Sequence, residues 1–175
     1  MLAESPLMPE IRIIETANLD IATVALERLM NRPANLPGLG AFYGPSGYGK
    51  TVAAMRARNR CNGYYVQLLS VWGPGAILDA ILVKAMGVIK PPRTVPQKVE
   101  AAAAQLAASG RPLILDDAGY AADTKARIGV IRDLYEASQS PILLVGEEEL
   151  PAHLKQWCCR RPKIDHVEGC LPAEN

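Results

Sequence analysis

The most informative part of this sequence is the run Gly44-Pro45-Ser46-Gly47-Tyr48-Gly49-Lys50-Thr51. It matches the pattern G-x-x-x-x-G-K-[ST], whose glycines permit the backbone to turn successive N–H groups inward around phosphate oxygens. Lys50 would neutralise the β- and γ-phosphates of ATP, and the Thr51 hydroxyl would hold Mg²⁺. A chance match is expected in roughly one chain of this length in a hundred or fewer. The run therefore predicts a nucleotide-binding loop.

The residues on either side of this loop support the prediction. Leu39 to Tyr43 is short and apolar, as expected of a buried strand. Lys50 to about Asn59 is expected to form a helix, whose N-terminus would add a favourable dipole for phosphate. The predicted order is therefore strand, phosphate loop and helix.

A second motif lies further along the chain, where the apolar run Leu113–Leu115 ends in Asp116 and Asp117. A buried parallel strand points its terminal carboxylates at the sheet edge where ligands bind. We expect Asp116 to orient Mg²⁺ or its water, and Asp117 to act as a general base on an attacking water. Taken alone, these residues are better explained as a solvated turn. With the phosphate loop upstream, the functional interpretation is the stronger one.

The fold class follows from the other apolar segments. Further strands are expected at 64–69, 141–145 and 163–168, alternating with helical segments. This alternation is typical of a parallel sheet covered on both faces. We expect a three-layer α/β sandwich with a five-stranded parallel sheet, in which residues 1–17 form an N-terminal arm and residues 18–175 form one nucleotide-binding domain.

Composition excludes some classes of protein and leaves others open. The chain is 49% hydrophobic and 21% charged, with a net charge of +1, which excludes a mostly disordered chain. This charge does not decide for or against nucleic acid, because a local basic patch can still exist. No apolar run is long enough to cross a membrane, and the four cysteines form no paired framework. We expect a reduced, cytoplasmic protein without a membrane partner.

Together these motifs resemble those of the AAA+ ATPases. More narrowly, the chain is similar to the transposition ATPases typified by the phage Mu B protein, with relatives in the IstB and TnsC groups. The segments that carry the resemblance are Ile14–Ala17, Gly44–Thr51, Leu113–Tyr120, Ile142–Leu150 and Leu154–Trp157. The block ILLVGEEEL at Ile142–Leu150, combined with the other segments, narrows it to the transposition group.

The resemblance implies an ATPase that binds double-stranded DNA as an oligomer or filament and stimulates a separate transposase, in a bacterial or phage-infected cell. It implies that Lys50 and Thr51 contact the nucleotide and the metal ion, and that Asp116 is the acid on the metal side. Asp117 takes the position of a catalytic Glu that is one methylene longer, so we expect slow hydrolysis. Glu147 takes the position of a polar sensor residue.

The resemblance also leaves points open. Either Arg160 or Arg161 would be the arginine finger that completes a neighbouring subunit's site, and an ordinary solvated pair is an equal alternative. Such proteins usually carry a small helical lid after this point; the sequence ends at Asn175, so we expect either that the lid has been truncated or that it is reduced.

The residues that would contact DNA, and the function itself, have alternatives. Lys90, Arg93 and Lys98 are candidate DNA contacts, since they lie between the second and third predicted strands. A solvated helix face is the alternative for any one of them. A helicase-loader-like ATPase and a small-molecule kinase are the alternative functions. The first would prefer single-stranded DNA, and the second would bind a small acceptor as a monomer.

Overall fold

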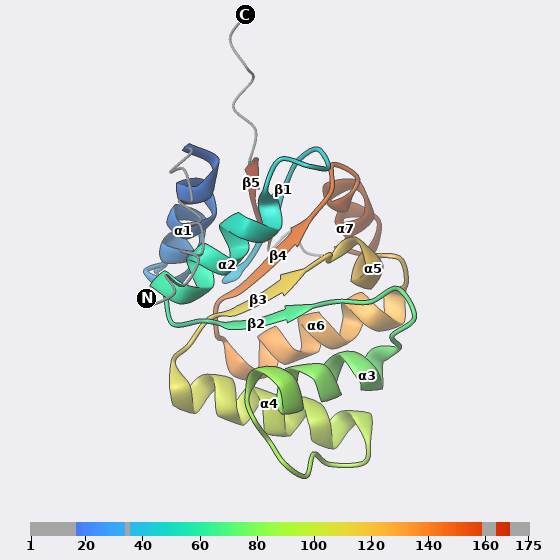
Figure 1. Cartoon of the computed structure of the whole chain (residues 1–175). Coiled ribbons are helices and arrows are strands. Elements are labelled where there is room, and N and C mark those ends of the chain that lie inside the picture. The colour runs from blue at the N-terminus through green and yellow to red at the C-terminus, as the bar shows by residue number, and fades with distance from the viewer. Residues whose placement is uncertain (1–16, 34–35, 159–163, 169–175) are drawn as a thin grey trace, which may run out of the picture.

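The computed structural model describes residues 17–33, 36–158 and 164–168 (Figure 1). The elements in chain order are α1 (Ala17–Met30), β1 (Leu39–Tyr43), α2 (Lys50–Arg60), β2 (Tyr64–Gln67), α3 (Pro74–Asp79), the π-helix η1 (Ala80–Ala85), α4 (Val95–Ser109), β3 (Leu113–Asp116), α5 (Gly119–Ala122), α6 (Lys125–Ser138), β4 (Ile142–Gly146), α7 (Leu150–Cys158) and β5 (Ile164–Glu168). The expected arm, apart from Ala17 in α1, lies outside the described residues.

The strands form one parallel sheet in the order β2-β3-β4-β1-β5. The strand that precedes the phosphate loop and the strand that ends in the acidic pair are therefore separated by β4. In the register of the parallel strands, Tyr43 pairs with Gly146 and Gln67 pairs with Asp116. The carboxyl ends of β1, β2, β3 and β4 therefore lie at the same edge of the sheet. The predicted parallel α/β sheet is confirmed.

Successive side chains of the central strands point to opposite faces of the sheet, so there is a hydrophobic core on each face. In β4, Ile142 and Leu144 pack in a cluster with side chains of α3, η1, α4 and α6. Leu143 and Val145 pack on the opposite face in a cluster with α1 and α2. Figure 1 shows these two helical layers on either side of the sheet, with α5 and α7 beside the carboxyl ends of β3 and β4. The result is a three-layer α/β fold.

Helix α2 lies close to the sheet because its buried face is made only of alanine, at Ala53, Ala54 and Ala57. Small side chains shorten the distance between a helix and a sheet without leaving a cavity. On its other side α2 packs against α1, where Asp20 pairs with Arg56 at 3.3 Å. The loop between β1 and α2 is thus held at both ends by buried elements.

Candidate nucleotide-binding site

The phosphate loop has the backbone conformation that its glycines require. Gly47 has φ +82° and Gly49 has φ +75°, both in the left-handed region where glycine is the favoured residue. A Cβ at either position would meet no atom within 4 Å, so backbone conformation, and not crowding, explains these two glycines. Ser46, Gly47 and Tyr48 are exposed at the tip of the loop, accessible to a ligand.

Lys50 begins α2 and folds back over this loop. Its ammonium donates a hydrogen bond to the Pro45 carbonyl at 2.6 Å, and the side chain is partly buried. The predicted phosphate-binding cation is therefore held directly over the loop that it would serve. Thr51, the predicted metal-side hydroxyl, follows in the first turn of α2 and is exposed.

The acidic pair lies at the end of β3, and its two members have different surroundings. Asp116 is 1% exposed. Its Oδ2 accepts a hydrogen bond from the Tyr65 hydroxyl at 2.8 Å, and its Oδ1 accepts one from the backbone N–H of Asp117 at 2.9 Å. Asp117 has φ +54°, outside regular strand geometry, and its Oδ2 accepts from the Gln67 amide at 2.8 Å. Each carboxylate is thus fixed by a side chain of β2.

Tyr65 and Gln67 are site residues that sequence reasoning missed. They are two residues apart in β2, so they stand on the same face of the sheet. Burial and the hydrogen bond to Asp116 raise the pKa of Tyr65 well above its ordinary value. The tyrosine therefore stays a neutral hydrogen-bond donor. Their period-2 spacing was the available signal, but using it required knowing that β2 is the neighbour of β3.

A hollow of about 270 Å³ opens beside Asp117. Its lining residues come from the segments after β3 and β4 and from α7, and they are Asp117, Gly119, Tyr120, Asp123, Gly146, Glu147, Glu149, Leu150 and His153. The two catalytic candidates Asp117 and Glu147 thus share one hollow although they follow different strands. Its carboxylates would repel phosphate and attract a cation. The hollow is therefore suited to a cationic group, and not to a triphosphate.

The donor set is compatible with Mg²⁺ bound together with a nucleotide. Mg²⁺ is usually held by one or two carboxylates plus substrate phosphates, and not by a dedicated protein cage. Asp116 offers a carboxylate at the end of β3, and Thr51 offers a hydroxyl in the first turn of α2, after the neighbouring end of β1. In the described part of the chain, no group of three or more His, Cys, Asp or Glu side chains could hold a metal ion.

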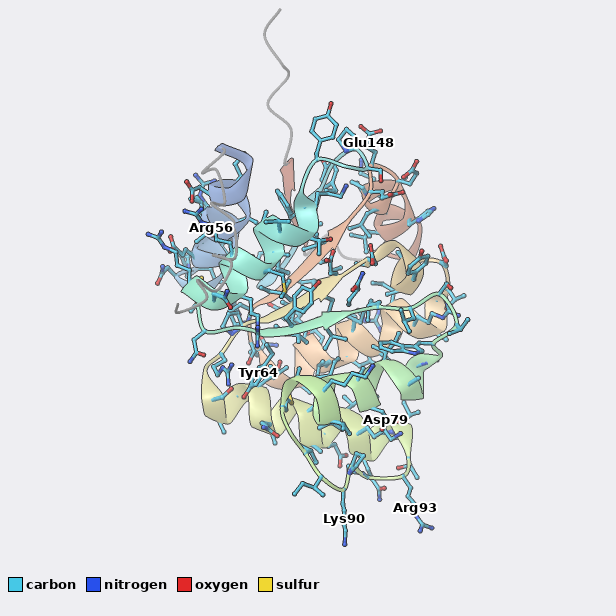
Figure 2. The ribbon with its side chains drawn as sticks, viewed as in Figure 1. Arg56, Tyr64, Asp79, Lys90, Arg93 and Glu148 are labelled. Atoms are coloured by element: carbon cyan, nitrogen blue, oxygen red, sulfur yellow. The ribbon has the colours of Figure 1, made fainter. Side chains whose placement is uncertain are left out.

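The candidate DNA contacts divide into two kinds. Lys90 and Arg93 are exposed and project from the loop between η1 and α4, at the end of the molecule away from Glu148 (Figure 2). Lys98 is different, because it is buried and its ammonium lies 2.7 Å from Asp79 Oδ2. Because its ammonium is paired with Asp79, Lys98 is a weaker candidate for a phosphate contact than Lys90 and Arg93.

Arg160 and Arg161, the candidate arginine fingers, lie outside the described residues. Of the helices that the structure describes, none has the length and apolar character needed to span a membrane.

No protein-family model matches the sequence, and no curated protein matches it either. Solved structures do match. The Orc1 protein of Aeropyrum pernix, solved in complex with DNA, has a TM-score of 0.63 and 19% identity, and the match covers 87% of this chain and 43% of that one. A chain in the structure of Drosophila ORC bound to GC-rich DNA and Cdc6 has a TM-score of 0.58 and 11% identity, covering 87% and 56%. Cdc6p of Pyrobaculum aerophilum has a TM-score of 0.54 and 16% identity, covering 93% and 47%.

The chain shares the fold of these solved structures. It spans about half of the length of the solved chains that it matches. At these identities the likeness shows the fold, and the narrower similarity to transposition ATPases stays a prediction.

Proposed function

We propose that this chain is an ATPase that binds Mg²⁺–ATP at residues 44–51 and binds double-stranded DNA in an ATP-dependent manner. One observation is the main support for the nucleotide site in this proposal. The phosphate loop after β1 and the acidic pair at the end of β3 lie at the same edge of one parallel sheet, with only β4 between these two strands. This arrangement gives a bound nucleotide a cation on one side and carboxylates on the other.

Each residue has a distinct role in this proposal. Lys50 would leave the Pro45 carbonyl and neutralise the β- and γ-phosphates, while the Thr51 hydroxyl and Asp116 would hold the metal. The bound Mg²⁺ supplies positive charge that offsets the charge developing on the phosphate oxygens. Asp117 would accept the proton of the attacking water. Since its side chain is short and bonded to Gln67, we expect slow turnover.

The proposed oligomer follows from the acidic hollow and the predicted finger. Asp117, Glu147 and their neighbours would attract a cationic side chain from an adjacent copy, and Arg160 or Arg161 would supply it. Glu147 would then sense whether the neighbour is in place. A site completed by a second copy would couple hydrolysis to assembly on DNA.

The DNA-binding part of the proposal is supported by two observations. Orc1 of A. pernix and Drosophila ORC, both structural neighbours, were solved with DNA. Lys90 and Arg93 offer exposed positive charge on one loop, which suits contacts to phosphates without sequence preference. Within this function, we propose that the protein activates target DNA for a separate transposase, as the similarity of the motifs implies.

The second candidate is a helicase-loader-like ATPase, whose main partner would be another protein. The Drosophila complex favours keeping it, because there ORC is bound to Cdc6 as well as to DNA. The two candidates share the nucleotide site. They differ in whether duplex or single-stranded DNA is preferred.

Fluorescence anisotropy of a labelled random-sequence duplex tests the proposal. The protein is titrated with and without ATP and Mg²⁺, beside a matched single strand and the Lys50→Ala variant. We expect cooperative, ATP-dependent binding to the duplex that is lost in the variant. Preference for the single strand would favour the loader, and absence of binding to either strand form would contradict the DNA-binding function.

A further inference from the structure

The side chain of Tyr65 connects two parts of the proposed site. Its ring packs against the core cluster on the α2 face of the sheet, which contains Ala53, Ala54 and Ala57 of α2. Its hydroxyl reaches across to β3 and donates to Asp116 at 2.8 Å. One side chain thus contacts both the layer that carries the phosphate loop and the acid on the metal side.

Asp116 depends on this contact because it is almost fully buried. A carboxylate removed from water is costly unless it is hydrogen-bonded or paired with a charge. In the part of the chain that the structure describes, no cationic side chain forms an ion pair with Asp116. Its partners there are the N–H of Asp117 on Oδ1 and the hydroxyl of Tyr65 on Oδ2.

These two hydrogen bonds hold different oxygens, so together they fix the rotation of the carboxylate group. Each carboxylate oxygen has about two lone-pair directions, so one on each remains for a metal ion or its water. The backbone bond to Oδ1 is built into the turn after β3. The bond to Oδ2 comes from another strand and can be removed by itself.

We propose that Tyr65 is a positioning residue, which holds the Asp116 carboxylate in the orientation needed for Mg²⁺ bound with the nucleotide. This inference rests on the proposed function, since it concerns the same site. Tyr65 does not touch the nucleotide in this proposal and acts only through Asp116. Partners that orient a metal ligand typically change metal affinity by 10- to 100-fold when they are removed.

The test is the Mg²⁺ dependence of nucleotide binding in Tyr65→Phe, which removes the hydroxyl and keeps the ring. The probe is a fluorescent, non-hydrolysable ATP analogue, titrated first in EDTA and then at increasing Mg²⁺. Tyr64→Phe is the matched control. Tyr64 is the adjacent residue of β2, and its ring belongs to the core on the opposite face of the sheet. Thermal melts of both variants establish that they are folded.

We expect the half-saturating Mg²⁺ concentration to rise about tenfold in Tyr65→Phe and to stay unchanged in Tyr64→Phe. Affinity in EDTA should be unchanged in both, and high Mg²⁺ should restore binding to Tyr65→Phe. A Mg²⁺ dependence in Tyr65→Phe equal to that of the wild type would overturn the inference and leave the nucleotide site intact. A wild-type protein that binds no analogue at any Mg²⁺ concentration would instead refute the proposed function.

Discussion

Replacing Gly49 by alanine should weaken the fold, whereas the same replacement at Gly129 should strengthen it. The two positions are a matched pair, because a Cβ at either one would meet no atom within 4 Å. Their backbones differ. Gly49 precedes α2 with φ +75°, and Gly129 lies inside helix α6. Any difference in stability between the two variants therefore reports the backbone conformation of the phosphate loop.

The size of the difference follows from that conformation. The left-handed region costs a non-glycine residue about 1–2 kcal/mol. Both variants share a gain of about 0.4–1 kcal/mol, because alanine lowers the entropy of the unfolded chain equally at either position. The gain cancels in the comparison, which leaves Gly49→Ala about 1–2 kcal/mol less stable than Gly129→Ala. For a domain of this size this is a difference of about 2–8 °C in melting temperature.

Calorimetric or circular-dichroism melts without nucleotide measure this difference directly. Gly129→Ala should melt above the wild type and Gly49→Ala below Gly129→Ala. Gly49→Ala should also bind nucleotide more weakly, because the loop would leave the conformation that turns its N–H groups inward. Equal melting temperatures for the two variants, or a higher one for Gly49→Ala, would refute the left-handed conformation at Gly49.

Three further predictions concern catalysis, DNA and the ion pair between Lys98 and Asp79. Asp117→Asn should keep nucleotide affinity and slow ATP hydrolysis at least about a hundredfold, because the proton acceptor is lost; an equal loss of binding would place Asp117 on the metal or in the fold. Replacing Lys90 and Arg93 together by alanine should flatten the slope of log affinity for duplex against log salt by about 2, since two phosphate contacts are lost. Lys98→Ala removes one of the same charges but should leave that slope unchanged, and a flatter slope would return Lys98 to the DNA surface. Melts of Lys98→Ala should show lower stability, because the ion pair with Asp79 is lost, and an unchanged melting temperature would argue against that pair.

The parts of the fold that follow from local pattern were predictable from the sequence. The runs at Leu39–Tyr43 and Ile142–Gly146 are apolar enough to indicate strands buried on both faces, and they are strands. The glycines at Gly47 and Gly49 indicated a tight loop, and both have positive φ. Each of these features depends on neighbours in the sequence, and local pattern is sufficient for that.

The parts that depend on strand order were not predictable. No local pattern says that β4 lies between β1 and β3, or that β2 is the neighbour of β3. The hydrogen bonds from Tyr65 to Asp116 and from Gln67 to Asp117 follow from that order. The ion pair of Lys98 was not predictable for a related reason, since its partner Asp79 belongs to another helix.

The central claim is that residues 44–51 bind ATP with Lys50 as the phosphate cation. The most direct measurement is the dissociation constant of a fluorescent ATP analogue, in Mg²⁺, for the wild type, Lys50→Ala and Lys125→Ala. Lys125 is an exposed lysine at the start of α6 and serves as the control for loss of a charge. We predict that Lys50→Ala loses at least about 30-fold in affinity, corresponding to about 2 kcal/mol for an unpaired charge in the complex. Lys125→Ala should bind as the wild type does, and a Lys50→Ala variant that also binds with wild-type affinity would contradict the claim.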